Sequence, residues 1–392
     1  MEFGNYGYRD EFTGRGWRDK RTNIEKEIPL RHWHLNDPGV MPNLVQTGAG
    51  SPTGIIVYEG ELLPSVFKNQ VIHCDAGPSV VRSYVATRTG AGYSAEIVDL
   101  LNGARRDRWF RPSDVVTAPD GSLIVADWYD PGVGGHNMRD LDRGRLFLVA
   151  PENHKYKASK VDVSSISGAI TAIKSPNEAT RYLAWHALNK QGKKAEPALQ
   201  KLFGDSNPRH RARALWLLGK IDGRGQHYVD LAIKDKDADI RIVGLRLARQ
   251  LADVEAIAVV AKLVSDKSAQ VRRECAIALR HTKTSQAAKL WAELASRHDG
   301  KDRWYLEALG LASDLNADAC FAAWLSKVGG KWNTPAGRDV VWRVRAKAAP
   351  GYLVKILKHK EVPAETHPRY VRALDFHSGP EKDKALEALL DI

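Results

Sequence analysis

The sequence predicts a multidomain β + α protein, in which a partial β-propeller of about three blades is followed by an α-solenoid. In residues 1–155, short β-branched and aromatic runs are separated by Gly, Pro and Asn. In residues 156–392, one helical pattern recurs about every 30 residues. The charge also changes there: the first part has 18 Lys and Arg against 20 Asp and Glu, and the second has 41 against 27. We therefore expect a first domain over 1–155 and a second over 156–392.

Seven segments of the first part have the composition of strands, with no helical pattern between them. They are TGIIVYEG (53–60), NQVIHCD (69–75), VVRSYVAT (80–87), AEIVDLL (95–101), DVVTAPDG (114–121), SLIVADWYD (122–130) and GRLFLVAP (144–151). Pro119, Asp120 and Gly121 predict a tight hairpin turn. Three blades alone leave strand edges exposed, because closed propellers have about four to eight blades. We therefore expect that N-terminal blades are missing and that the chain is a fragment.

Four segments of the second part align without gaps around a central arginine. They are SPNEATRYLAWHAL (175–188), DSNPRHRARALWLL (205–218), DKDADIRIVGLRLA (235–248) and DKSAQVRRECAIAL (266–279). The aligned arginines are Arg181, Arg211, Arg241 and Arg272, and Arg303 continues the series. The Asp or Ser that begins each segment is predicted to cap a helix, and a second apolar helix follows, as at 228–234 and 256–264. Helix pairs of this length must stack to bury their apolar faces, which gives the solenoid.

This repeat resembles the short HEAT-like class, whose units carry an early Asp and an Arg in the second helix. The resemblance implies polar ladders between repeats, in which Asp205, Asp235 and Asp266 accompany Arg211, Arg241 and Arg272. A structural role for the repeated arginines is therefore preferred to ligand binding. Nucleic-acid binding by the basic solenoid is a lower-ranked alternative, because many arginines occupy the repeated internal position.

Several polar, glycine-rich segments carry a more specific resemblance. They are residues 4–21, 31–39, 46–54 and 127–145, together with FRPSDVVTAPDGSLIVADW (110–128). They resemble the later blades of the membrane-bound dehydrogenase family of Planctomycetes and related bacteria, whose propellers are similar to quinoprotein sugar dehydrogenases and are followed by HEAT-like repeats. The order of these parts matches nearly the whole chain.

The resemblance implies a quinoprotein-type dehydrogenase acting on sugars or alcohols, exported to the periplasm. In the full-length protein the implied cofactors are pyrroloquinoline quinone and calcium. The implied partner is a protein docked on the solenoid, such as a cytochrome c domain. We expect this fragment itself to be inactive. The alternative function is a non-catalytic scaffold that binds protein or polysaccharide.

The cysteines and the hydropathy exclude a c-type haem site and a membrane-spanning helix from this sequence. The chain has three cysteines and no C-x-x-C-H motif, so it carries no attachment site for a c-type haem. No apolar run approaches the roughly 18 residues of a membrane span. The first residues also lack a secretory signal pattern, so export is expected from the resemblance alone.

Three residues are candidates for cofactor binding, whereas no catalytic residue is assigned. His32 and His34 flank Trp33, so in a strand both imidazoles would project from one face. They are candidates for cofactor binding, with a pair of structural histidines as the preferred alternative. Arg111 follows Phe110 and is a candidate to pair with an anionic quinone. An ion pair between Arg111 and Asp114 is the alternative we prefer.

An oxygen-rich cluster is the candidate metal site, since calcium prefers six to eight oxygen ligands. Its members lie within 16 residues and are Asp127, Asp130, His136, Asp140 and Asp142. Their spacing does not fit the EF-hand loop. Turn formation and pairing with Arg139, Arg143 and Arg145 account for the same residues, and this alternative is preferred.

Overall fold

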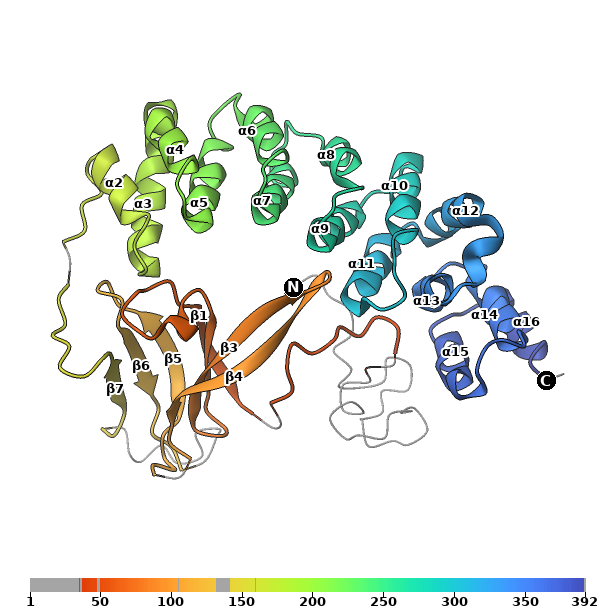
Figure 1. The fold of residues 1–392 in the computed structure, drawn as a ribbon, viewed down its shortest axis with the longest axis horizontal. Coiled ribbons are helices and arrows are strands. Elements are labelled where there is room, and N and C mark those ends of the chain that lie inside the picture. Colours follow the sequence, from red (N-terminus) through yellow and green to blue (C-terminus); the bar gives the residue numbers. More distant parts are fainter. Residues whose placement is uncertain are drawn as a thin grey trace. The chain divides into compact units, whose positions relative to one another are not determined.

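The computed structural model describes residues 35, 37–47, 50–104, 106–131, 142–158 and 160–390. Strands come first and helices second (Figure 1), so the predicted order of β and then α is confirmed. Contacts divide the described part of the chain into two compact units. The strand-bearing unit comprises the described residues of Leu44–Arg88 and Tyr93–Tyr228, and the helical unit comprises those of Met1–Asn43, Thr89–Gly92 and Val229–Ile392.

Two antiparallel sheets form the β part, and all seven predicted strands are confirmed. The first sheet has the order β1-β2-β3-β4, with β1 (Pro52–Val57), β2 (Val71–Asp75), β3 (Val80–Thr89) and β4 (Gly92–Asn102). The second has the order β5-β6-β7, with β5 (Pro112–Thr117), β6 (Leu123–Asp127) and β7 (Arg145–Val149). Within each sheet, every strand pairs with the next one along the chain, which is expected where turns rather than helices connect the strands.

The predicted hairpin joins β5 to β6. The amide of Ala118 donates to the carbonyl of Ser122 at 2.8 Å, and Gly121 has a φ of +90°. A side chain would strain this backbone conformation, which explains the glycine in the Pro-Asp-Gly turn. The turn therefore fixes the register of Val116 opposite Ile124.

One apolar core holds the two sheets together. Alternate residues of the strands point into it, such as Ile72 and Cys74 of β2 and Leu123 and Val125 of β6. Tyr58 is fully buried in this core, and its hydroxyl donates to the carbonyl of Gly121 at 2.7 Å. The bond ties the hairpin turn to the end of β1.

The helices follow in a continuous series. They are α2 (Ile166–Ala172), α3 (Glu178–Gln191), α4 (Glu196–Phe203), α5 (Pro208–Leu218), α6 (Gly225–Ala232), α7 (Ala238–Ala248), α8 (Ala256–Leu263), α9 (Ala269–Leu279), α10 (Ser285–Ala295), α11 (Arg303–Ser313), α12 (Ala317–Val328), α13 (Pro335–Arg343), α14 (Ala349–Leu357), α15 (His367–Leu374) and α16 (Pro380–Glu387). The apolar helices predicted at 228–234 and 256–264 are confirmed as α6 and α8. Within the described residues, every helix is too short or too polar to cross a membrane.

The predicted helix caps lie two residues too early. The side chains that cap α3, α5, α7 and α9 belong to Asn177, Asn207, Asp237 and Ser268. The residue that begins each repeat instead accepts a hydrogen bond from the amide of the cap residue. Asp235 does so from Asp237, and Asp266 from Ser268, each at 2.8 Å. Such side-chain turns compete with capping for the same residue types, which explains the error.

Four of the five repeated arginines hold equivalent positions, each four residues after the cap. They are Arg181, Arg211, Arg241 and Arg272. Arg303 differs, because it follows its cap Asp302 directly as the first residue of α11. Arg303 therefore continues the spacing of the series but takes a different place in its helix. The loop before α11 is longer than its counterparts, so the arginine spacing persists while the helix begins later.

The implied pairing of arginine and aspartate between repeats is present at Arg241. Its guanidinium forms two hydrogen bonds to the Asp266 carboxylate, at 2.7 and 2.8 Å. The same side chain donates to the carbonyl of Asp235 at 2.8 Å. Arg241 therefore joins α7 to the start of the next helix pair and also closes its own loop.

Candidate functional site

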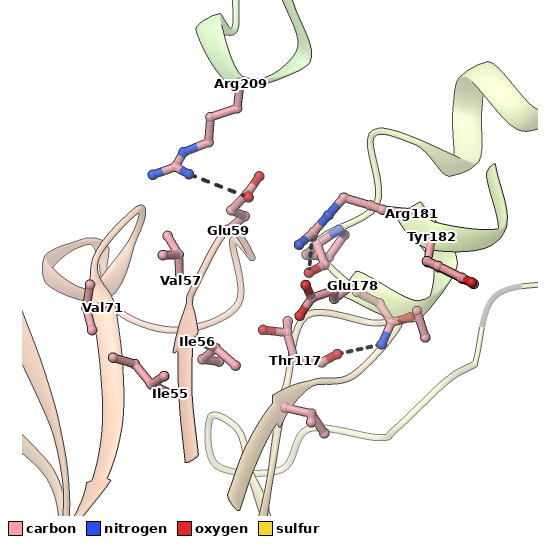
Figure 2. A pocket seen from close by; sticks show the side chains of 14 residues that line it. Ile55, Ile56, Val57, Glu59, Val71, Thr117, Glu178, Arg181, Tyr182 and Arg209 are labelled. Carbon is pink, nitrogen blue, oxygen red and sulfur yellow. Dashed lines mark hydrogen bonds and ion pairs between the residues drawn. The ribbon is translucent and has the colours of Figure 1, made fainter. Parts of the chain in front are cut away.

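The candidate site is a cleft of about 990 Å³ in the strand-bearing unit (Figure 2). Strands β1, β2 and β5 form one side of it, and α3 with the start of α5 forms the other. The apolar lining residues are Ile55, Ile56, Val57, Val71, Val116, Pro176 and Ala179. The polar ones are Glu59, Thr117, Asn177, Glu178, Arg181, Tyr182 and Arg209.

At one end of the cleft, β1 lies directly against β5. Thr53 donates its hydroxyl hydrogen bond to the carbonyl of Pro112 at 2.8 Å. At Gly54 the two backbones are so close that an added Cβ would lie 2.6 Å from the Cα of Asp114. Glycine is therefore required at this position. Beyond it, residues 55–57 of β1 face residues 116–117 of β5 across the cleft.

The cleft follows the free edge of β1. Three consecutive residues, 55–57, line it, although successive side chains of a strand point to opposite faces. An opening that touches all three must therefore run along the strand edge. Among the strands that the structure describes, none pairs with this edge, since β1 is the terminal strand of its sheet and pairs with β2 on its other side.

The rim of the cleft is apolar and exposed. Ile55 is 63% exposed, Val57 38%, Val116 45% and Tyr182 63%. Single exposed apolar side chains are ordinary on protein surfaces, whereas several around one opening are typical of a binding site.

Glu59 connects the segment after β1 to the arginines of α5. Its carboxylate accepts a hydrogen bond from Arg213 of α5, and Arg209 lies 3.6 Å from its other oxygen. Arg209 also donates to the carbonyl of Asn69 at 3.3 Å. The start of α5 is thus tied to the loop that follows β1.

Arg181 adds a cation that is only partly compensated. Its guanidinium donates to the carbonyls of Ser175 and Pro176 at 3.0 and 2.7 Å. Burial lowers the pKa of Arg181, and the positive charge of Arg213 lowers it further, while Glu59 and Glu178 act in the opposite direction. The surroundings therefore disfavour the cation, and an added negative charge would stabilise it.

Asn177 connects β5 to α3 at the side of the cleft. Its side-chain amide donates to the carbonyl of Thr117 at 2.7 Å, and its side-chain oxygen accepts from the amide of Thr180 at 2.8 Å. One residue therefore caps α3 and joins it to the end of β5. Residues distant in sequence form one cleft because of this contact and that of Glu59.

The structure places the predicted cofactor residue Arg111 outside this cleft. Its guanidinium donates to the hydroxyl of Ser79 and to the carbonyls of Phe110 and Pro131. Asp114 accepts a hydrogen bond from the amide of Val115 at 2.8 Å, so the predicted pairing of Arg111 with Asp114 is wrong. Arg111 connects the chain near residue 79 to the chain that follows β6.

The carboxylate of Asp127, a predicted metal ligand, is already surrounded by donors. It accepts from the amides of Arg111 and Tyr129 at 2.7 and 2.9 Å and from the Nε of Arg145 at 2.7 Å. Its side chain is fully buried, and a second nitrogen of Arg145 lies 2.6 Å away. Three hydrogen bonds and this ion pair satisfy both oxygens of the carboxylate. The preferred alternative of arginine pairing therefore holds for Asp127.

The other candidates do not complete a metal or quinone site in the described part of the chain. Asp130 is buried and Asp142 is exposed. His32, His34, His136 and Asp140 lie outside the described residues. Among the residues that the structure describes, no three His, Cys, Asp or Glu side chains are grouped to hold a metal ion. Among the candidates that the structure describes, Arg111 and Asp127 are thus bonded to other groups of the chain.

The cleft residues were not predicted as a site. One signal was present: Ile55, Ile56 and Val57 form an unbroken apolar run, whereas a strand with one solvated face alternates. The charged side carried no signal, because Glu59 and Arg209 are 150 residues apart and meet only in the folded chain.

Comparisons with known proteins match part of the chain. Residues 18–155 match a family model described as a domain of unknown function, DUF7133. Nothing among the curated proteins matches. An engineered protein of known crystal structure is 16% identical, and the similarity covers 58% of this chain and 71% of that one. Its TM-score of 0.27 is too low to support an argument about the fold.

Proposed function

We propose that this chain is a non-catalytic scaffold, and that the cleft beside β1 binds an extended protein segment carrying apolar side chains and a carboxylate. The observation that carries the proposal is the free edge of β1, which lies open beside exposed apolar residues and arginines.

The edge provides main-chain hydrogen bonds. In β1, Ile55 pairs with His73 and Val57 with Val71, so one side of the strand is used by β2. The other side faces the cleft and can accept an added strand from a partner. Main-chain pairing of this kind gives affinity, and alternate side chains give specificity. Ile55 and Val57 would contact apolar side chains of the partner.

The charges favour an acidic partner. Arg181, Arg209 and Arg213 outnumber Glu59 and Glu178 at the far side of the cleft. A carboxylate there would gain charge-assisted hydrogen bonds from guanidinium groups that are already positioned. A basic segment would instead place a further cation beside them.

The wider architecture is compatible with a scaffold. The β1-β2-β3-β4 meander supports a propeller blade with β1 innermost, and the close approach of β5 to β1 supports a neighbouring blade. The equivalent arginines and the bond from Arg241 to Asp266 support HEAT-like stacking. Both architectures present extended surfaces for partners. Periplasmic location stays a prediction from the resemblance.

Dehydrogenase activity on sugars or alcohols also stays a prediction from the resemblance. Of the residues proposed for it, Arg111 and Asp127 are bonded within the chain. Polysaccharide binding has no specific support in the cleft, where aliphatic rather than aromatic side chains form most of the apolar lining.

Selection from a display library of random peptides tests the proposal. We expect the full chain to enrich peptides with alternating apolar residues and an Asp or Glu. Binding should be lost in Ile55→Glu and in Arg209→Glu. The matched control is Leu146→Glu, since Leu146 is 76% exposed on β7 and does not line the cleft. Failure to enrich such peptides, or equal binding to Ile55→Glu and the control, would contradict the proposal.

A further inference from the structure

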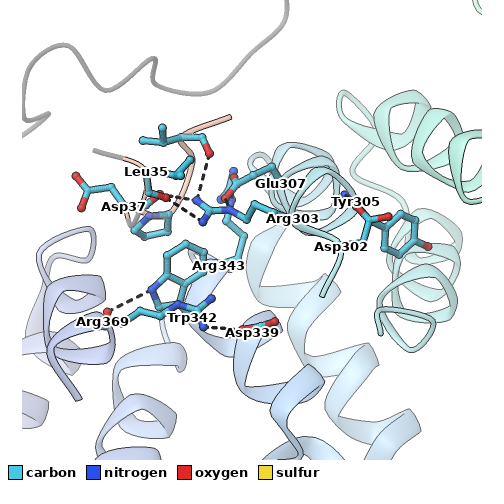
Figure 3. A network of polar contacts seen from close by, with 12 residues as sticks. Leu35, Asp37, Asp302, Arg303, Tyr305, Glu307, Asp339, Trp342, Arg343 and Arg369 are labelled. Carbon is cyan, nitrogen blue, oxygen red and sulfur yellow. Dashed lines mark hydrogen bonds and ion pairs between the residues drawn. The ribbon is translucent and has the colours of Figure 1, made fainter. Parts of the chain in front are cut away.

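In the helical unit, three arginines contact a short turn formed by residues 37–40 (Figure 3). We name these residues the Asp37 turn. The amide of Val40 donates to the carbonyl of Asp37 at 3.3 Å, and Gly39 has a φ of +100°. Proline second and glycine third, with this glycine conformation, is the pattern of a type II turn. The sequence Asp-Pro-Gly-Val therefore has a strong local preference for this shape.

The carboxylate of the turn is held by α15. Arg372 donates from Nε to one oxygen of Asp37 at 2.9 Å and from Nη2 to the other at 2.8 Å. The side chains of Arg372 and Asp37 are 7% and 4% exposed. Two parallel hydrogen bonds between guanidinium and carboxylate give both energy and geometric selectivity.

The backbone of the turn is held by two further arginines. Arg303 of α11 donates to the carbonyls of Leu35, Asp37 and Val40 at 3.0, 2.8 and 3.2 Å. Arg345, just after α13, donates to the carbonyl of Pro38 at 3.0 Å. The side chain of Val40 is completely buried. The helical unit therefore contacts the turn through its backbone carbonyls and the Asp37 carboxylate, and the side chain of Val40 is buried.

The arginines that contact the turn also make contacts within the helices, as Arg303 shows. Glu307 is fully buried between Arg303 and Arg343, with the bond from Arg303 at 2.7 Å. Burial alone would raise the pKa of Glu307, but the two guanidinium groups lower it overall. Arg303 also lies over the ring of Trp342, 4.7 Å from its centroid. These contacts position Arg303 independently of the turn.

We propose that α11, α13 and α15 form a binding site for an aspartate-bearing Pro-Gly turn, and that the Asp37 turn is its built-in ligand. The site recognises the turn through ionic and hydrogen bonds and one buried valine. A separate peptide with the same sequence has the same groups, so it competes for the site. This proposal concerns the helical unit and is independent of the cleft beside β1.

A labelled peptide with the sequence of residues 33–42 tests the proposal by fluorescence anisotropy. We expect the full chain with Asp37→Ala to bind it about 100-fold more tightly than the wild type does, because the built-in ligand is weakened. Replacing aspartate by asparagine in the peptide should reduce the affinity about tenfold. Adding Arg372→Ala to the chain should have the same effect. Asp375→Ala is the matched control, because it removes only the 51% exposed partner of Arg372.

Equal affinity for the aspartate and asparagine peptides would overturn the proposal. An affinity that Arg372→Ala does not change would overturn it too. If Asp37→Ala does not fold, hydrogen exchange in the wild-type chain provides the second measurement. Excess aspartate peptide should accelerate exchange of the Val40 amide by displacing the turn, whereas the asparagine peptide should not. Unchanged exchange at saturating aspartate peptide would also overturn it.

Discussion

Asp37 and Arg372 form a buried bidentate ion pair although 335 residues separate them in sequence. The pair fastens the segment before the first strand to the helix nearly at the end of the series. Because neither side chain has much access to water, removal of one partner leaves a charge that is costly to bury.

Asp37→Ala is expected to lower the free energy of unfolding by about 3 kcal/mol. Arg372→Ala should act similarly, and the double variant should lose less than the sum of the two, because the pair is removed together. Urea denaturation followed by circular dichroism measures these changes. The control Asp375→Ala should change the free energy by about 0.5 kcal/mol or less, since the Asp375 side chain is 51% exposed. Additive single and double variants would show that the pair contributes little.

Asp205 is expected to make the free energy of unfolding depend on pH in the acid range. A hydrogen bond from Lys174 and one from the amide of Asn207 lower the pKa of Asp205 to about 2, against an ordinary value of 3.8. A carboxyl with a lowered folded-state pKa stabilises the fold above its ordinary pKa, and this contribution is lost as the pH falls from about 4 to about 2. Urea midpoints measured across this range should fall for the wild type.

Lys174→Met should flatten that acid-dependent fall, because it removes the main cause of the low pKa. Lys201→Met is the control, since Lys201 is on α4 and is not among the described hydrogen-bond partners of Asp205. The same slope in wild type and Lys174→Met would contradict this assignment.

Calcium is not expected to stabilise the chain. Both oxygens of Asp127 already accept hydrogen bonds, so binding calcium would require displacing Arg145. The Tm should be the same in calcium and in a chelator. Asp127→Asn should lower the free energy of unfolding by about 2 kcal/mol in either condition, because it weakens bonds to a buried charged group. A calcium-dependent rise in Tm that Asp127→Asn abolishes would restore the metal site.

Purified chain supplemented with pyrroloquinoline quinone and calcium is expected to show no sugar-dependent dye reduction. The physical reason is the internal bonding of Arg111 to Ser79, Phe110 and Pro131. Dye reduction with a panel of sugars and alcohols provides the measurement. Turnover that disappears in Arg111→Ala would support the dehydrogenase and weaken the scaffold proposal.

The three cysteines are expected to be unreactive in the native state. Burial raises the pKa of Cys74 and of Cys320 to about 12, and it raises that of Cys275 even further. Because the thiolate is the reactive form, an aromatic disulfide reagent should titrate almost no thiol at neutral pH. In denaturant all three should react. Rapid reaction of a native thiol would indicate local opening of the β core or of α9 or α12.

The strands and helices follow from local patterns. All seven strands were predictable because turn residues bound each run, as Pro119, Asp120 and Gly121 do between β5 and β6. The repeated arginines predicted equivalent helices for the same reason, since helical periodicity is local. The predicted caps lie two residues too early because Asp and Ser can either cap a helix or accept a hydrogen bond from the amide of the cap residue. Composition does not distinguish these two roles.

The candidate site depended on contacts that no local pattern encodes. Glu59 meets Arg209 and Arg213, and Asn177 meets Thr117, only after strands and helices have packed. The tertiary structure also gave partners from elsewhere in the chain to Arg111, a candidate for cofactor binding, and to Asp127, a candidate metal ligand.

The sequence by itself determined the order of β and α parts, the strand positions and the helical repeat, since each depends on neighbouring residues. Only the tertiary structure decided which charges are compensated and which strand edge stays open. A side chain's chemistry depends on the groups within a few ångströms of it, and in this protein those groups come from positions as distant as 37 and 372.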